Sequence, residues 1–165
     1  MSMETPKELF IHELQDIYDA EHRILQMLPL MAQESENEQV KEAFQHHEEE
    51  TKQQVTNLEQ CFEALGAKAK GSACHAVAGM KQEHDSFLKE KPSSAILVMY
   101  NLGGASKTEH YEIASYKDLV EQANLLGEKK VAQLLLDNLK QEEEMAKKVE
   151  QLSKQLGKKA AAQHK

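Results

Sequence analysis

The sequence predicts an all-α fold, in which four long helices form a bundle and a short fifth helix lies in the connection between the second and third. The composition and the scarcity of turn signals support this prediction. Among 165 residues there are only 3 Pro, 7 Gly and no Trp, and 5% are aromatic, whereas 29% are charged. Ala, Glu, Lys, Leu and Gln dominate, and these residues favour helices, whereas a sheet needs more β-branched and aromatic residues. A chain of this length suits one domain with a sizeable core.

The few turn signals divide the chain into helices. Thr5-Pro6 is typical of a helix start, because Thr caps the N-terminus and Pro fits the first turn. Gly66, Gly127 and Gly157 can each end a helix, and Lys91-Pro92-Ser93 breaks one. The predicted helices cover about 6–35 (with a kink at Pro29), 38–65, 74–89, 94–126 and 128–156. Short links join the two long helices of each half, so each half should be an antiparallel hairpin.

The charge distribution argues against a nucleic-acid-binding protein. The formal net charge is −8, and Lys is concentrated only between Lys154 and Lys165. We expect a helical domain over residues 1–157 and a polar, frayed tail over residues 158–165. No signal peptide and no membrane-spanning run is apparent, so we expect a cytoplasmic protein that binds no membrane. Cys61 and Cys74 have no metal-ligand spacing, and we expect free thiols.

An acidic residue interrupts the apolar face of each long helix. At core spacing, Glu21 interrupts the first helix and Glu142 the last. In the second helix the polar residues are His47 and Glu50, one turn apart. The face of the third long helix has a single carboxylate among Met99, Leu102, Ser106, Glu109, Ile113, Tyr116 and Val120. Glu is rarely buried unless paired, so a carboxylate near the middle of every long helix needs a common explanation.

Two interpretations of these carboxylates are open. Divalent cations at the centre of the bundle would offset the repulsion, and no cluster of Lys or Arg lies on the same faces to do so. Alternatively, each Glu reaches water with its long side chain, and His47 is a hydrogen-bonded core histidine. The recurrence over four helices favours the cations.

Segments around these positions resemble a known family, the YciE/YciF-type ferritin-like stress proteins. The most specific segment is EHYEIASY at Glu109–Tyr116, and His47–Thr51, Leu139–Glu143 and Tyr18–Glu21 also fit. The resemblance covers nearly the whole chain. It implies a ferritin-like four-helix bundle, a homodimer and an iron-type site. The positions that match the family pattern are Glu21, His47, Glu50, Glu109, Glu112 and Glu142.

The chain departs from the usual ferritin-like ligand pattern. Di-iron proteins of this fold carry Glu-x-x-His on two helices, whereas this chain has the reverse order at His47 and Glu50, and Met145 replaces the His expected after Glu142. A site richer in oxygen favours Fe or Mn. Gly103-Gly104 also interrupts the third long helix, and the pair indicates close packing, a local bulge or tolerated slack.

Two functions are compatible with these residues. In the first, the carboxylates hold about two Fe or Mn ions per chain for metal oxidation or for O₂ or peroxide chemistry. Glu50 and Glu142 are then the bridging candidates, and Tyr18, Tyr111 and Tyr116 are near enough to tune the site or to pack beside it. In the second, the bundle is a non-enzymatic stress or interaction protein that acts as a structural dimer. No catalytic residue is assigned by the sequence.

Overall fold

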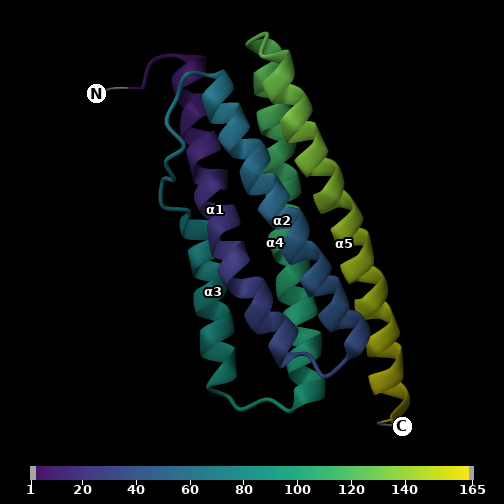
Figure 1. Ribbon diagram of the computed structural model, residues 1–165. Coiled ribbons are helices and arrows are strands. Elements are labelled where there is room, and N and C mark those ends of the chain that lie inside the picture. Colours follow the sequence, from purple (N-terminus) through teal and green to yellow (C-terminus); the bar gives the residue numbers. More distant parts are fainter. Residues whose placement is uncertain (1–2, 164–165) are drawn as a thin grey trace.

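The computed structural model describes residues 3–163, which form five α-helices and no strand. The four long ones are α1 (Pro6–Glu34), α2 (Glu38–Ala64), α4 (Ser94–Leu125) and α5 (Lys129–Gln163), and α3 (His75–Leu88) is shorter. Figure 1 shows the long helices side by side, with α3 in the connection that returns the chain from the end of α2 to the start of α4. This arrangement confirms the predicted four-helix bundle with a crossover helix.

Each long helix packs against two others. α1 contacts α2 and α4, and α5 contacts the same pair, so α1 and α5 lie diagonally across the bundle. The hairpins α1–α2 and α4–α5 are antiparallel, as the short links predict (Figure 1). The helix α3 lies against α1 and α4 on the outside of the bundle. No helix within residues 3–163 combines the length and the apolar character needed to cross a membrane.

The predicted helix ends are largely confirmed. Thr5 and Glu8 form a capping box, with Pro6 in the first turn, and the Asn37 side chain accepts a hydrogen bond from the amide of Val40 at 3.2 Å. Gly66 and Gly127 follow α2 and α4 with φ of 64° and 76°, which a residue with a Cβ adopts at a cost. The helix α1 continues through Pro29, and the predicted kink there stays a prediction.

The predicted end of the last helix is wrong. α5 continues past Gly157 to Gln163, because Gly157 does not adopt the positive φ of a helix-ending glycine and is followed by Lys and Ala, which favour helices. Residues 158–163, which we expected in a frayed tail, are therefore helical. Residues 1–2 and 164–165 lie outside the described part, and the division of the chain at residue 157 stays a prediction.

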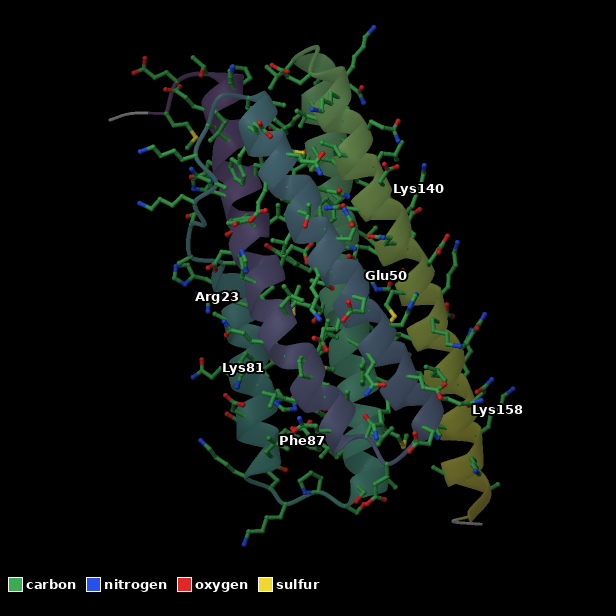
Figure 2. All side chains as sticks on the ribbon, viewed as in Figure 1. Arg23, Glu50, Lys81, Phe87, Lys140 and Lys158 are labelled. Atoms are coloured by element: carbon green, nitrogen blue, oxygen red, sulfur yellow. The ribbon has the colours of Figure 1, made fainter. Side chains whose placement is uncertain are left out.

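The core runs along the axis of the bundle. Its largest members with almost no exposed surface include Phe10, Leu14, Phe44, Phe62 and Tyr116. The buried face of α4 differs from the predicted one, because Val98 and Ala105 are buried while Met99 is 38% exposed. This shift reflects the contacts of α4 with α1, α3 and α5, which cover a wide face and bury both Glu109 and Glu112. The apolar core thus encloses a set of charged side chains at mid-length. Positively charged side chains such as Lys81, Lys140 and Lys158 point outward instead (Figure 2).

Candidate metal centre

Four of the six predicted site residues form one buried cluster. His47 from α2, Glu109 and Glu112 from α4, and Glu142 from α5 each offer a ligand atom, and these atoms lie within 4.8 Å of one another. None of the four side chains exposes more than 3% of its surface. The three helices that carry them contribute residues distant in sequence, so the packing of the helices against one another creates the cluster.

The imidazole of His47 lies between carboxylates. Its Nε2 atom is 3.4 Å from Oε1 of Glu109 and 3.5 Å from Oε2 of Glu142. Its Nδ1 atom is 3.3 Å from Oε2 of Glu50. Glu109 and Glu142 are also within hydrogen-bonding reach of each other. A ring in this position can donate one nitrogen to a cation while a carboxylate orients the other nitrogen.

Glu21 joins the cluster from α1, beside Glu112. The hydroxyl of Tyr116 donates a hydrogen bond to Oε1 of Glu21. Oε2 of Glu21 has no partner, although the side chain is completely buried. Glu21 therefore presents one free oxygen to the interior, as a ligand would.

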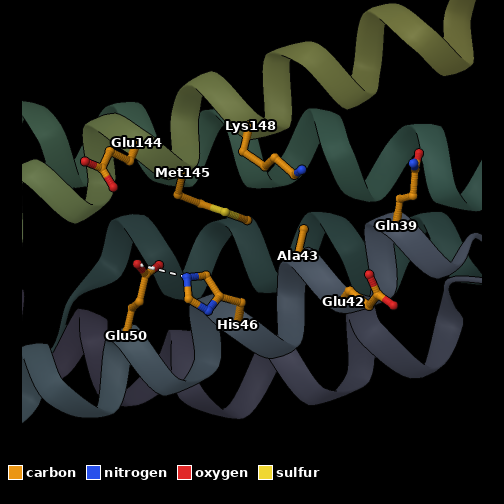
Figure 3. Close-up of a pocket in the computed structure, with 8 residues that line it drawn as sticks. All are labelled: Gln39, Glu42, Ala43, His46, Glu50, Glu144, Met145 and Lys148. Carbon is orange, nitrogen blue, oxygen red and sulfur yellow. Dashed lines mark ion pairs between the residues drawn. The ribbon is translucent and has the colours of Figure 1, made fainter.

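Glu50 occupies the edge of the cluster and connects it with solvent. Its side chain is 18% exposed and pairs with Nε2 of His46 at 3.3 Å as well as with His47. Figure 3 shows Glu50 and His46 from α2 facing Glu144, Met145 and Lys148 from α5 across a pocket of about 460 Å³. The structure thus brings together all six predicted residues, four in the cluster and one on either side of it.

Burial and mutual repulsion make the site hold protons. Burial, together with the charge of Glu142, raises the pKa of Glu21 to about 8 despite the hydrogen bond from Tyr116. The same two causes raise the pKa of Glu109 and of Glu112 well above the usual value for a carboxyl group. Burial also raises the pKa of Glu50, but hydrogen bonds and charge from His47 and His46 outweigh it and lower that pKa overall.

The polar atoms of the cluster lack partners in a way that fits a cation. Within the described chain, atoms without a hydrogen bond include Oε2 of Glu109, both oxygens of Glu112 and Oε2 of Glu142. None of the buried polar side chains among residues 3–162 is Lys or Arg. Leaving buried acceptors unpaired is costly, and a group of them around one point could hold a positive ion. Three carboxylates and one imidazole form a donor set that suits Fe or Mn.

Amide side chains that the sequence does not single out as site residues support the carboxylates. Nε2 of Gln54 donates to Oε1 of Glu142. Asn138 donates to the hydroxyl of Tyr116 at 3.1 Å and accepts from Asn57 at 2.7 Å, so a chain of hydrogen bonds ends at Glu21. Two signals could have revealed them. Gln54 lies on the apolar face of its helix, and Asn138 lies one turn before Glu142 on the same face.

Only one of the three tyrosines considered from the sequence reaches the cluster. Tyr116 contacts Glu21, whereas Tyr18 donates to Glu59 and Tyr111 donates to Asp16 at 2.6 Å. Tyr111 also contacts Cys74, at 3.2 Å from the sulfur. Cys61 and Cys74 are free and buried, as the sequence predicts.

Comparisons with known proteins find the same fold and related sequences. Protein YciF of Escherichia coli (strain K12) is 35% identical over 143 residues, which is 86% of each chain. The crystal structure of the E. coli stress protein YciF matches with a TM-score of 0.90 at 33% identity, over 95% of this chain and 99% of that one. YcfI from Rhodopseudomonas palustris matches with a TM-score of 0.87 at 34% identity, over 90% and 95% of the two chains.

A family match covers nearly the whole chain as well. Residues 5–162 match the family described as "Domain of unknown function (DUF892)". This range includes α1 to α4, all of α5 except its last residue, Gln163, and every residue of the carboxylate cluster. The sequence resemblance to the YciE/YciF-type proteins is thereby confirmed, and the chain belongs to the DUF892 family.

Proposed function

We propose that this protein is a ferritin-like di-metal carboxylate protein that binds about two Fe or Mn ions per chain and serves in metal oxidation or in O₂ or peroxide chemistry. The observation that carries the proposal is the buried cluster of His47, Glu109, Glu112 and Glu142, whose ligand atoms lie within 4.8 Å of one another and largely lack partners. No buried Lys or Arg among residues 3–162 neutralises it.

The contacts suggest different roles for the six residues. Glu142 is the best bridging candidate, because it lies close to both His47 and Glu109 and its charge acts on Glu21 and Glu112. Glu50 is better suited to a terminal position, because its polar contacts among the described residues are with His47 and His46, and it is partly exposed. Glu21 is a candidate for a terminal ligand of the ion that lies nearer to Glu112.

The surrounding residues would hold these ligands in place and manage protons. Bound Fe or Mn ions would supply electrons to O₂ or peroxide, or accept them from peroxide. Gln54 fixes one oxygen of Glu142, and Tyr116 fixes one oxygen of Glu21, which leaves the other oxygen of each free. Because Glu21, Glu109 and Glu112 have raised pKa values, they release protons when a cation replaces those protons.

Metal analysis tests this function. Protein purified without chelator, or reconstituted with Fe²⁺ or Mn²⁺, should contain about two ions per chain, and Glu109→Ala should lose most of them. Glu49→Ala is the matched control, because Glu49 is on the same bundle but 71% exposed and paired with Lys52. Absence of divalent metal after reconstitution of wild-type protein would contradict the proposal and favour a non-enzymatic interaction protein.

We further propose that the protein acts as a homodimer in the cytoplasm. Large apolar side chains remain exposed on the described surface, among them Leu9, Leu30, Ile96 and Leu125, the last at 80%. Burial of such side chains between two copies would stabilise a dimer. Light scattering should therefore return the mass of a dimer, and an assembly of about a dozen subunits or more would contradict it.

A further inference from the structure

A cavity of about 150 Å³ lies between α1, α3 and α4, on the side of the bundle that the crossover helix covers. At its rim, Lys107 of α4 pairs with Glu83 of α3 at 3.3 Å, and both side chains are more than 60% exposed. The cavity therefore opens to solvent between these two helices. Its wall is mostly apolar and includes Met27, Met31, Met80, Tyr100, Gly103 and Gly104.

A second, smaller cavity shares part of its wall with the first and reaches Glu109 of the carboxylate cluster. It has a volume of about 20 Å³, and it shares Met27, Met31 and Thr108 with the outer cavity. Its remaining wall is formed by Ile24, Leu28, Ala105 and Glu109. Glu109 is 2% exposed, and its Oε2 atom has no partner. The two cavities thus adjoin each other, and the inner one is bounded by a carboxylate of the candidate metal centre.

The polar groups along this route are mostly engaged with one another. The hydroxyl of Thr108 lies 3.0 Å from the carbonyl oxygen of Gly104 and 3.4 Å from the sulfur of Met80. Nδ2 of Asn101 and Nε2 of His84 both contact Oε2 of Glu34, at 2.8 and 2.9 Å. Oδ1 of Asn101 is an unpaired acceptor beside the outer cavity. The inner cavity offers only Thr108 and Glu109 as polar side chains.

Gly103 and Gly104 line the outer cavity. A Cβ at either position would meet no other atom within 4 Å, so the pair does not serve close packing, and α4 continues through it as a regular helix. Each Gly lowers helix stability by about 1 kcal/mol relative to Ala. Because glycine has no side chain, free space remains in the outer cavity beside the thioethers of Met27, Met31 and Met80.

We propose that the two cavities form a passage through which O₂ reaches the metal centre, an inference that rests on the proposed function. O₂ is small, uncharged and apolar, and it needs no hydrogen bonds inside such a wall. Peroxide and hydrated cations would lose hydrogen bonds to water that the inner cavity does not replace. The pocket beside Glu50 opens between α2 and α5 instead, and it is lined by Glu42, Glu144 and His46.

The substitution Gly104→Leu tests the passage, because Gly104 lines the outer cavity, a Cβ there meets open space, and Leu improves the helix propensity of α4. Oxidation of Fe²⁺-loaded protein is followed by stopped-flow absorbance, where each O₂ takes one electron from each of two Fe²⁺ and two protons to leave as hydrogen peroxide. The rate at limiting O₂ should fall by about tenfold or more. Gly157→Leu is the matched control, because Gly157 also faces open space but lies on α5 outside both cavities, and its rate should equal that of wild type.

Xenon provides a second measurement that needs no metal. Crystals of the metal-free protein under xenon pressure should show a xenon atom in the outer cavity beside Met27, and Gly104→Leu crystals should not. An empty cavity in wild type, or an unchanged O₂ rate in Gly104→Leu with normal iron content, would overturn the passage alone. If Gly104→Leu slowed the oxidation of bound Fe²⁺ by peroxide but not its oxidation by O₂, the assignment of the passage to O₂ would be overturned. Failure of wild type to bind iron would overturn the proposed function, and the passage with it.

Discussion

The double substitution Glu21→Gln plus Glu142→Gln should raise the melting temperature of the metal-free protein at neutral pH while abolishing metal uptake. Both side chains are completely buried, and the charge of Glu142 contributes to the raised pKa of Glu21. A Gln has nearly the same shape, and its amide oxygen can still accept the hydrogen bonds from Tyr116 and Gln54. The change therefore removes like charge from the core and keeps the packing.

The expected gain is about 2 kcal/mol in the free energy of unfolding, because a carboxyl group with a pKa near 8 must take up a proton when the chain folds at neutral pH. For a domain of this size, that gain corresponds to about 4–8 °C in melting temperature. The control is Glu49→Gln plus Glu150→Gln, which removes the same charge from side chains exposed at 71% and 63%. It should change the melting temperature little. A Glu21→Gln plus Glu142→Gln variant that melts below metal-free wild type would refute a buried carboxylate cluster.

The metal-free protein should also become more stable on acidification from about pH 8 to pH 5.5. The folded chain holds a proton on Glu21 below its pKa of about 8, whereas the unfolded chain releases that proton above the ordinary Glu pKa of 4.5. Between these two values the folded state binds more protons, so stability falls as pH rises, by about 1.4 kcal/mol per pH unit for each such proton. Glu109 and Glu112 act in the same direction, because their pKa values are also raised.

Thermal melts across this pH range, with and without metal, check the prediction. The gain should end near pH 5, because carboxyl groups with lowered pKa values, such as Asp19 and Glu50, stabilise the folded chain only while they are ionised. Protein loaded with Fe or Mn should not gain stability on acidification, since protons compete with the metal for the same oxygens. A metal-free protein whose melting temperature falls between pH 8 and pH 5.5 would contradict the raised pKa values.

The fold could be predicted from the sequence because its local signals agree with one another. Thr5, Gly66 and Gly127 mark helix ends by capping and by the backbone freedom of glycine, and the structure uses them in this way. Gly157 is also a glycine, but Lys and Ala residues follow it, and α5 continues through it. A glycine alone therefore does not end a helix when the flanking residues favour helix on both sides.

The candidate site could be predicted in part, because a buried carboxylate conflicts with its apolar neighbours in the sequence. Glu21, Glu109 and Glu142 were identified from this conflict, and the structure buries each of them. Glu112 was added only by the family resemblance, because the predicted apolar face of α4 was displaced from the real one. The partners of these side chains depend on which helices face each other, so the contacts of Gln54 with Glu142 and of Tyr116 with Glu21 had to await the structure.

The cavities could not be predicted from the sequence, for a related reason. Gly103-Gly104 was visible as a disturbance in a helix, but its effect depends on α3 and α1 passing beside it. Free space between three helices has no periodic signal along one of them. Only the packed bundle shows that the glycines, the methionines and Thr108 share a wall that leads to Glu109.

Crystallography of metal-loaded protein tests the metal centre most directly. Crystals soaked with Fe²⁺ or Mn²⁺ should show about two anomalous scattering peaks per chain at the absorption edge of that metal, each within about 2.0–2.4 Å of carboxylate oxygens. The expected ligands include Glu109, Glu142 and His47, and a Glu109→Ala crystal soaked in the same way should lose at least one peak. Peaks confined to exposed carboxylates, with Glu109, Glu112 and Glu142 left without metal in the soaked wild-type crystal, would contradict a metal centre in the core of the bundle.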